Sequence, residues 1–190
     1  MIARYTRPAM GAIWTDESRF SIWLEIEILA SEAQAELGIV PREAIPVIRE
    51  RAAFSVDRIN ELEKTLNHDV VAFLTNVAEN VGEYSRFIHL GLTSSDVVDT
   101  ALSVLIRKSG LILRDGLAGL LPVLAAKAKE HRHSVMIGRT HGIHAEPMTF
   151  GLKMALWHEE VKRDLARLDR AIEAVSVGKI SGAVGTYAHV

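Results

Sequence analysis

The sequence contains no cysteine among its 190 residues, and only 6% of the residues are aromatic. The lack of cysteine excludes disulfides, thiolate nucleophiles and zinc sites with cysteine ligands. It is typical of proteins in a reducing compartment, and we expect a cytoplasmic location. A chain of this length can bury one sizeable core, so it is not a small scaffold that depends on covalent staples.

Excess charge of one sign and long apolar runs are also missing. The formal net charge of -2 leaves no broad basic surface for nucleic acid and favours small ligands. No stretch approaches the roughly 18 uninterrupted apolar residues of a membrane span, and the N-terminus has no apolar signal segment. We therefore expect neither membrane insertion nor secretion. The hydrophobic fraction of 48% is nevertheless high, which predicts that apolar helix faces meet other subunits in an oligomer.

The sequence does contain helical periodicity along nearly its whole length. Between Asp16 and Leu37 the apolar residues fall on one face, and Gly38 ends the run. Ser55 is a plausible N-cap for another helix, and His68 and Asp69 lie at the start of a third. After the first helix, the predicted helices span residues 42–51 (disturbed by Pro46), 56–65, 69 to about 82, 95–130 and 150–175.

Residues 138–147, Gly-Arg-Thr-His-Gly-Ile-His-Ala-Glu-Pro, form a non-helical segment between two long helical patterns. The segment is long, partly apolar and rich in titratable groups, unlike the short polar connections of helical bundles. His141 is the leading catalytic candidate, and an ordinary hydrogen-bonded loop histidine is the alternative. A metal held by His131 and His133, or by His141 and His144, lacks a third ligand at a recurring spacing, so we expect no metal.

Residues 91–96, Gly-Leu-Thr-Ser-Ser-Asp, precede the longest helical pattern. Thr93 and Asp96 have the spacing of a capping box with Asp in place of the usual Glu, and an ordinary helix cap is the simplest interpretation. Three consecutive hydroxyls exceed that need. Together with the free amides of a first helical turn they would suit a carboxylate. His89, five residues before Ser94, is expected near the same pocket.

Four segments stand out, at residues 64–73, 91–100, 138–147 and 181–186. Together they closely resemble the adenylosuccinate lyase family of purine biosynthesis. They occur in the family's order and spacing, and the resemblance covers the whole chain from Arg4 and Tyr5 onward. Argininosuccinate lyases, fumarases and aspartases share Thr140 and His141 but typically continue with Leu-Gln, where this sequence has Gly-Ile.

This resemblance implies an all-α fold, the long-helix bundle of the fumarase/aspartase type. It places an N-terminal helical domain at residues 1–111 and the first part of a central bundle domain at residues 112–190. It further implies a homotetramer whose active sites are shared between subunits, with no metal and no organic cofactor. The implied activity is that of a C–N lyase. Such an enzyme would eliminate fumarate from adenylosuccinate, giving AMP, and from the succinylated imidazole carboxamide ribotide SAICAR, giving AICAR.

The resemblance also implies what these 190 residues lack. In the family the base is a serine in a Ser-Ser-x-Met-Pro-x-Lys-x-Asn stretch, which this sequence does not contain. Residues 178–187 are glycine-rich and turn-like, and the sequence stops three residues later without a closing element, which suggests truncation. The chain alone is therefore expected to be inactive.

Site residues follow from the resemblance by matching position. His141 would be the general acid that protonates the departing nitrogen, and His68 would help to orient the substrate. Thr93 and Ser94 would hold a carboxylate of the succinyl group. The remaining matches are Arg4 and Tyr5 at the nucleotide phosphate, His89 on the same side, and Asp69 and Thr140 as lining residues.

Two other functions remain open from the sequence alone. The protein could be a sibling fumarate-releasing lyase with a different amine. It could also be a non-catalytic helical module that binds a nucleotide without turning it over. Cleavage of adenylosuccinate separates the proposed family from both.

Overall fold

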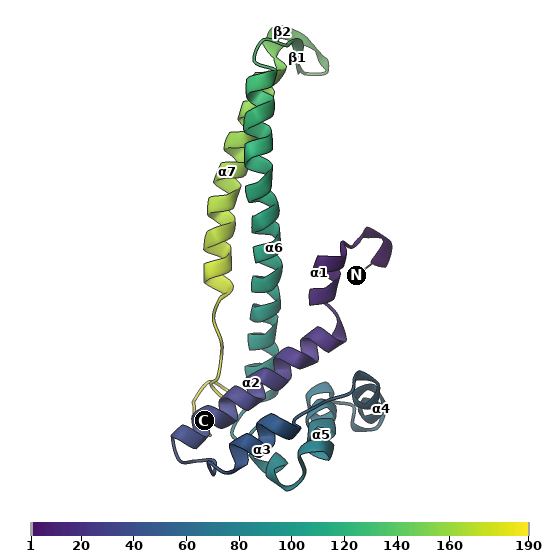
Figure 1. The fold of residues 1–190 in the computed structure, drawn as a ribbon, viewed down its shortest axis with the longest axis vertical. Coiled ribbons are helices and arrows are strands. Elements are labelled where there is room, and N and C mark those ends of the chain that lie inside the picture. The colour runs from purple at the N-terminus through teal and green to yellow at the C-terminus, as the bar shows by residue number, and fades with distance from the viewer. Residues whose placement is uncertain (1, 190) are drawn as a thin grey trace. The chain divides into compact units, whose positions relative to one another are not determined.

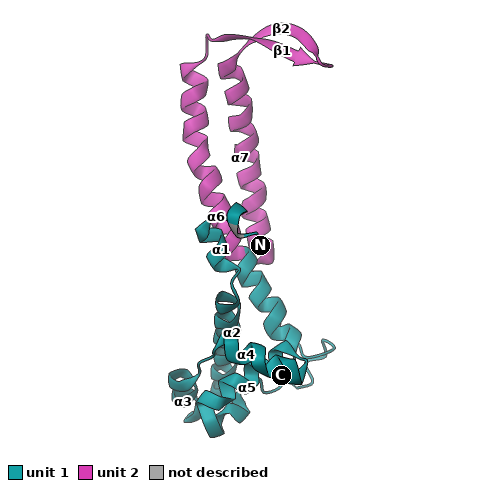
Figure 2. Cartoon of the chain, turned by 90° about the vertical axis from the view of Figure 1, so that its right-hand side faces the viewer, with its two compact units in different colours: residues 1–106, 176–190 teal, residues 107–175 magenta. Residues whose placement is uncertain are grey.

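The computed structural model describes residues 2–189, which fall into two compact units (Figure 2). The first unit comprises Met1–Ile106 and Ser176–Val190, and the second comprises Arg107–Val175. The expected all-α fold is confirmed, with a two-stranded hairpin as its departure among the described residues (Figure 1). The predicted domain border at residue 111 stays a prediction. In chain order the elements are η1 (Ala3–Tyr5), α1 (Pro8–Ile13), α2 (Asp16–Glu36), α3 (Ala44–Arg51), α4 (Val56–Leu66), α5 (Asp69–Val81), η2 (Gly82–Phe87), α6 (Ser94–Glu130), β1 (Val135–Thr140), β2 (Ile143–Thr149) and α7 (Phe150–Val175).

The core of the first unit forms around α2, as its apolar face predicts. Phe20 and Trp23 are buried and meet edge to face at 5.1 Å, and Phe73 of α5 stacks on Phe20 at 5.7 Å. Such aromatic pairs add about 0.5–1.5 kcal/mol beyond the burial of their area. The predicted helix at residues 42–51 instead begins at Ala44, so Pro46 lies in its first turn, where no intrahelical amide bond is lost.

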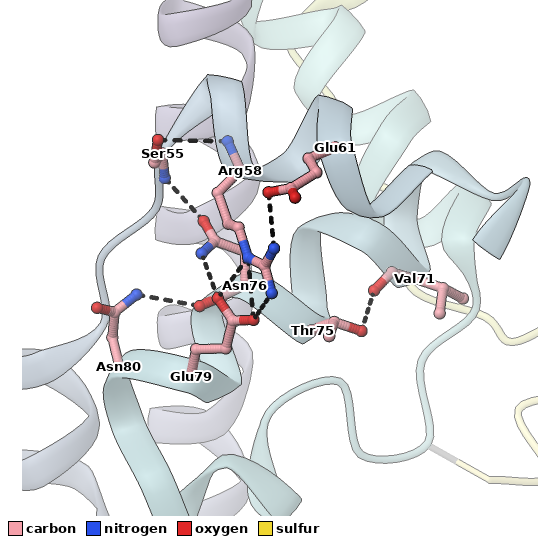
Figure 3. Close-up of polar contacts among 8 residues, drawn as sticks. All are labelled: Ser55, Arg58, Glu61, Val71, Thr75, Asn76, Glu79 and Asn80. Carbon is pink, nitrogen blue, oxygen red and sulfur yellow. Dashed lines mark hydrogen bonds and ion pairs between the residues drawn. The ribbon is translucent and has the colours of Figure 1, made fainter. Parts of the chain in front are cut away.

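Helices α4 and α5 are joined by a polar network near the start of α4 (Figure 3). The Ser55 side chain caps α4 by accepting a hydrogen bond from the amide of Arg58, as predicted. The Ser55 amide in turn donates to the buried Asn76 of α5 at 2.7 Å. Arg58 also binds Glu79 at 2.7 Å across the two helices. This network ties the start of α4 to the C-terminal half of α5.

The segment at residues 138–147 is non-helical, as predicted, but it is a β-hairpin rather than a loop. β1 and β2 pair antiparallel, with Val135 opposite Thr149 and Thr140 opposite Ile143. The register shifts next to Gly138, where a Cβ atom would lie 2.8 Å from the Glu146 carbonyl oxygen. Glycine is required there because the bulge brings the two backbones this close.

In the second unit α6 and α7 run side by side toward the hairpin (Figures 1 and 2). Arg114 of α6 donates to Asp169 of α7 at 2.7 Å, and Gly110 leaves room for Ile172. The apolar 3–4 repeat predicts a packing face along α7. The structure confirms the helix expected at residues 150–175.

We expect Gly151→Ala to destabilise the second unit. The new Cβ would lie 2.5 Å from the Ala128 carbonyl oxygen and 2.8 Å from Arg132 Cα, and backbone atoms cannot move aside as a side-chain tip can. The free energy of unfolding should fall by about 1–3 kcal/mol in urea denaturation. Gly116→Ala is the matched control, because nothing lies within 4 Å of its Cβ position. That variant should be neutral or more stable, and equal losses in both variants would contradict the packing argument.

Helix α6 presents much apolar surface in this single chain. Its most hydrophobic stretch has a mean hydropathy of 1.4 and is 11% buried, and by length and composition alone such a helix could cross a membrane. Leu120 and Val123 are exposed on it, as are Leu152 and Leu156 on α7. A bundle helix meets the same hydropathy criterion before its partners are added. The expectation of no membrane span stays a prediction.

Candidate active site

His141 lies at the tip of the hairpin, in its two-residue turn. Its backbone φ is 50° and that of Gly142 is 75°. Two consecutive positive φ angles define the type I′ turn that best fits the twist of antiparallel strands. The His141 and Thr140 side chains are exposed, and no hydrogen bond from them is seen to the rest of the described chain. The turn therefore presents an imidazole outward with its hydrogen-bonding groups free for a ligand.

At the start of α6, some polar side chains are hydrogen-bonded within the described chain and others are not. The Asp96 carboxylate accepts a hydrogen bond from the Thr93 amide at 3.0 Å, which is half of the predicted capping box. Ser95 accepts one from Lys179 at 2.7 Å. Within residues 2–189 no partner is seen for the hydroxyls of Thr93 and Ser94. These two hydroxyls and the first-turn amides of α6 form a place for an anion.

Asp96 also anchors the glycine-rich segment that follows α7. Its side chain is fully buried and accepts hydrogen bonds from Lys179 Nζ at 2.8 Å and from the amides of Ser181 and Gly182. Burial alone would raise the pKa of Asp96. The Lys179 hydrogen bond and the backbone amides outweigh burial and lower this pKa to about 2. The segment at residues 179–182 is thereby fixed beside Thr93.

His68 is the N-cap of α5, as predicted, and its Nδ1 accepts a hydrogen bond from the Val71 amide at 3.4 Å. A neutral imidazole that accepts through Nδ1 carries its proton on Nε2, which makes Nε2 a donor. The His68 side chain is about half exposed. The Asp69 carboxylate bonds the Val70 amide, so the two side chains face the same helix start.

His89 has the opposite arrangement. Its Nδ1 lies 2.6 Å from Glu27 Oε1, so Nδ1 carries a hydrogen and donates a hydrogen bond to the carboxylate. The side chain is 19% exposed, and the backbone φ of 66° is unusual for a residue other than glycine. Nε2 is left to bind a further group.

Arg4 and Tyr5 lie in the short helix η1 near the N-terminus. The Arg4 guanidinium sits 4.7 Å from the centre of the Tyr5 ring, and the Tyr5 side chain is 73% exposed. No contact between these two residues and the histidines of the first unit is seen in the described chain. The pair remains a predicted binding element.

Of two cavities in the described chain, only the smaller is lined by a predicted site residue. Asp69 lines a cavity of about 310 Å³ with Arg19 and Trp23 of α2 and Leu105 of α6. A larger cavity of about 770 Å³ in the second unit lies between the hairpin and α7, and His141 is not among its lining residues. No group of three potential metal ligands occurs among residues 2–189. The predicted site residues are thus distributed over both units.

Sequence reasoning missed two charged residues that support the predicted ones. Glu27 lies on the buried face of α2 and binds His89, and Lys179 binds Asp96. A signal for Glu27 exists in the sequence. Glu27, Ser31 and Gln34 continue the 3–4 spacing of the apolar face of α2, which places polar groups where burial is expected.

Comparison with known sequences gives close relatives over the whole chain. A model of the lyase family matches residues 3–190. Adenylosuccinate lyase from Bacillus subtilis is 58% identical over all 190 residues, and that from Streptococcus mutans is 52% identical over the same length. The chain spans 44% of the length of both relatives.

Solved structures share the same fold. A fumarate lyase from Mesorhizobium has a TM-score of 0.88 at 32% identity, covering 94% of this chain and 43% of that one. The β-carboxy-cis,cis-muconate cycloisomerase from Acinetobacter calcoaceticus has a TM-score of 0.89 at 29% identity, covering 96% of this chain and 44% of that one. Proteins with different names thus share this scaffold, so the fold alone does not identify the reaction.

Proposed function

This chain belongs to the lyase family, and we propose that the protein containing it is an adenylosuccinate lyase. It would release fumarate from adenylosuccinate to give AMP, and from SAICAR to give AICAR. The observation that carries the proposal is the 58% identity to a named adenylosuccinate lyase across the whole chain. The structural neighbours with other names are less similar, at 29% and 32% identity.

His141 is assigned the general acid of this elimination. A base removes a proton from the succinyl carbon next to the C–N carbon, that electron pair forms the double bond of fumarate, and the C–N bond breaks. The departing nitrogen then takes a proton from the His141 imidazole. An imidazole suits this step because it can carry a proton near neutral pH. Its place in a solvent-facing turn lets a substrate nitrogen approach it.

Thr93 and Ser94 are assigned the binding of a succinyl carboxylate. Their hydroxyls lie at the first turn of α6, where backbone amides and the helix dipole favour an anion. Charge builds up on this carboxylate as the proton leaves the adjacent carbon, so donors held there stabilise the transition state. The fixed segment at residues 179–182 supports this helix start through Asp96.

The remaining predicted residues are assigned to the nucleotide part of the substrate. Arg4 and Tyr5 would bind the phosphate with His89 on the same side, because a guanidinium and hydrogen-bond donors suit phosphate oxygens. His68 would orient the substrate through its Nε2 donor. Asp69 and Thr140 would line the site. No metal or organic cofactor has a role in these steps.

We also propose a homotetramer in the cytoplasm, with active sites shared between subunits. The exposed apolar residues of α6 and α7 support this, because a bundle in which such faces pack together removes them from water. The base would come from the part of the full-length protein outside these 190 residues.

The test compares this 190-residue chain with the full reading frame that contains it. The full protein is expected to cleave adenylosuccinate, followed by its ultraviolet absorbance change, and the chain alone to be inactive. The chain alone should lack turnover because the proton-abstracting serine of the family lies outside it. Turnover by the chain alone would contradict the placement of the base. No turnover by the folded full protein would refute the function.

A further inference from the structure

A stripe of buried polar residues on α2 holds the segment that carries His89. Glu27, Ser31 and Gln34 are at most 8% exposed, and their spacing places them on one helix face. The Gln34 amide donates to the Leu90 carbonyl oxygen at 2.7 Å, and the Ser31 hydroxyl approaches the Phe87 carbonyl oxygen at 3.3 Å. The Ser31 hydroxyl also donates to the Glu27 carbonyl oxygen at 2.9 Å, so the neutral attachment of this segment to α2 comes chiefly from Gln34.

Glu27 adds a negative charge that is not needed to attach the His89 segment to α2. Its carboxylate is fully buried, one oxygen bonds His89 Nδ1 at 2.6 Å, and within the described residues Oε2 has no hydrogen-bond partner. A buried carboxylate is costly unless a partner of opposite charge compensates it. A glutamine could tether the same loop at lower cost, so the charge at this position needs another explanation.

The geometry points to Glu27 as a positioning residue that acts through His89. By accepting the Nδ1 proton, Glu27 fixes both the rotation of the ring and the nitrogen left for substrate, which is Nε2. A hydrogen bond from Nε2 to a phosphate requires protons on both ring nitrogens, and the carboxylate balances the resulting charge. This inference rests on the proposed function, which puts His89 on the phosphate side of the nucleotide.

The left-handed backbone at His89 fits this role. A φ of 66° strains a residue with a side chain, and such a conformation persists where surrounding contacts hold it. The contacts of Ser31, Gln34 and Glu27 are those restraints. The ring is consequently held in place before a substrate arrives, which reduces the ordering cost of binding.

A double-mutant cycle in the full-length protein tests the inference. Glu27→Gln is expected to raise KM for adenylosuccinate about tenfold while kcat changes by less than about threefold, because a binding contact is weakened. His89→Gln should raise KM similarly. The double variant should be no worse than His89→Gln alone, because Glu27 acts only through that ring. Multiplied effects on KM would overturn the inference, since they would mean that Glu27 acts independently of His89.

Controls separate positioning from folding. Glu25→Gln changes an exposed carboxylate of the same helix and should leave KM and kcat unchanged. Glu27→Asp keeps the charge but withdraws the carboxylate by one methylene, so its KM should fall between those of wild type and Glu27→Gln. Each variant is checked by circular dichroism and native mass. If Glu27→Gln does not fold, the same cycle is made with Glu27→Asp, and an additive result overturns the inference equally.

The double-mutant cycle also distinguishes failure of the proposed function from failure of the role of Glu27. A folded wild-type protein that does not cleave adenylosuccinate refutes the proposed function and the inference together. A wild type that cleaves it, combined with an additive cycle, refutes only the role of Glu27. Cleavage with a non-additive cycle supports both.

Discussion

Replacing His141 by alanine in the full-length protein should lower kcat for adenylosuccinate by roughly a hundred- to ten-thousand-fold, so that turnover is essentially abolished. The departing nitrogen would leave without a proton, which makes it a poor leaving group. Because the side chain is exposed and no hydrogen bond from it is seen in the described chain, its loss should not disturb the fold. Helical content measured by circular dichroism should be unchanged.

The turn geometry suggests a sharper form of this experiment. His141 has a φ of 50°, which alanine adopts at a cost and asparagine tolerates well. His141→Asn therefore removes the acid while preserving the type I′ turn, and it should be as inactive as His141→Ala. His144→Ala changes an exposed histidine of the same hairpin and should retain turnover. Substantial activity in His141→Asn would remove His141 from the mechanism.

Asp96→Asn should lower the free energy of unfolding of the 190-residue chain by about 2 kcal/mol. The substitution leaves Lys179 without its buried counter-charge and weakens the hydrogen bonds that fix residues 181 and 182. The cost arises at the buried position 96, because a neutral amide binds these donors more weakly than a carboxylate does, whereas the Lys179 side chain is 38% exposed and stays partly hydrated. Urea denaturation at neutral pH measures the loss. Asp99→Asn is the control on the same helix, because Asp99 is exposed, and it should change stability little.

The effect of Asp96→Asn on the free energy of unfolding should also depend on pH. The pKa of Asp96 is lowered in the folded state from 3.8 to about 2. Its contribution to stability is therefore present above pH 3.8 and is lost as the pH falls from 3.8 toward 2. That contribution is about 2 kcal/mol, because one pKa unit corresponds to about 1.4 kcal/mol. The stability difference between wild type and Asp96→Asn should narrow over this range. A difference that stays constant with pH would contradict the lowered pKa.

Helix positions were largely predictable because their signals are local. Ser55 caps α4 and His68 lies at the start of α5 as expected, and the apolar repeat predicted α2 and α7 nearly to the residue. The hairpin was missed because Gly138 and Pro147 resemble loop residues. Its turn is His-Gly rather than the usual Asn-Gly or Asp-Gly, which hides the hairpin signal.

The supporting residues of the site were less predictable because their partners are distant in sequence. Glu27 and His89 are separated by 62 positions, and Asp96 and Lys179 by 83. No local pattern reports such pairs. A charged residue in a helix is ordinarily read as part of a solvated face. The candidate residues at His141, Thr93 and Ser94 could be named because they occur in unusual local segments.

The most direct test of the central claim is substrate discrimination by the full reading frame that contains this chain. Adenylosuccinate, argininosuccinate and malate are offered in parallel, and fumarate release is measured. The account predicts release from adenylosuccinate and none from the other two. Release from argininosuccinate or malate instead, or from none of them by a folded protein, would contradict the assignment.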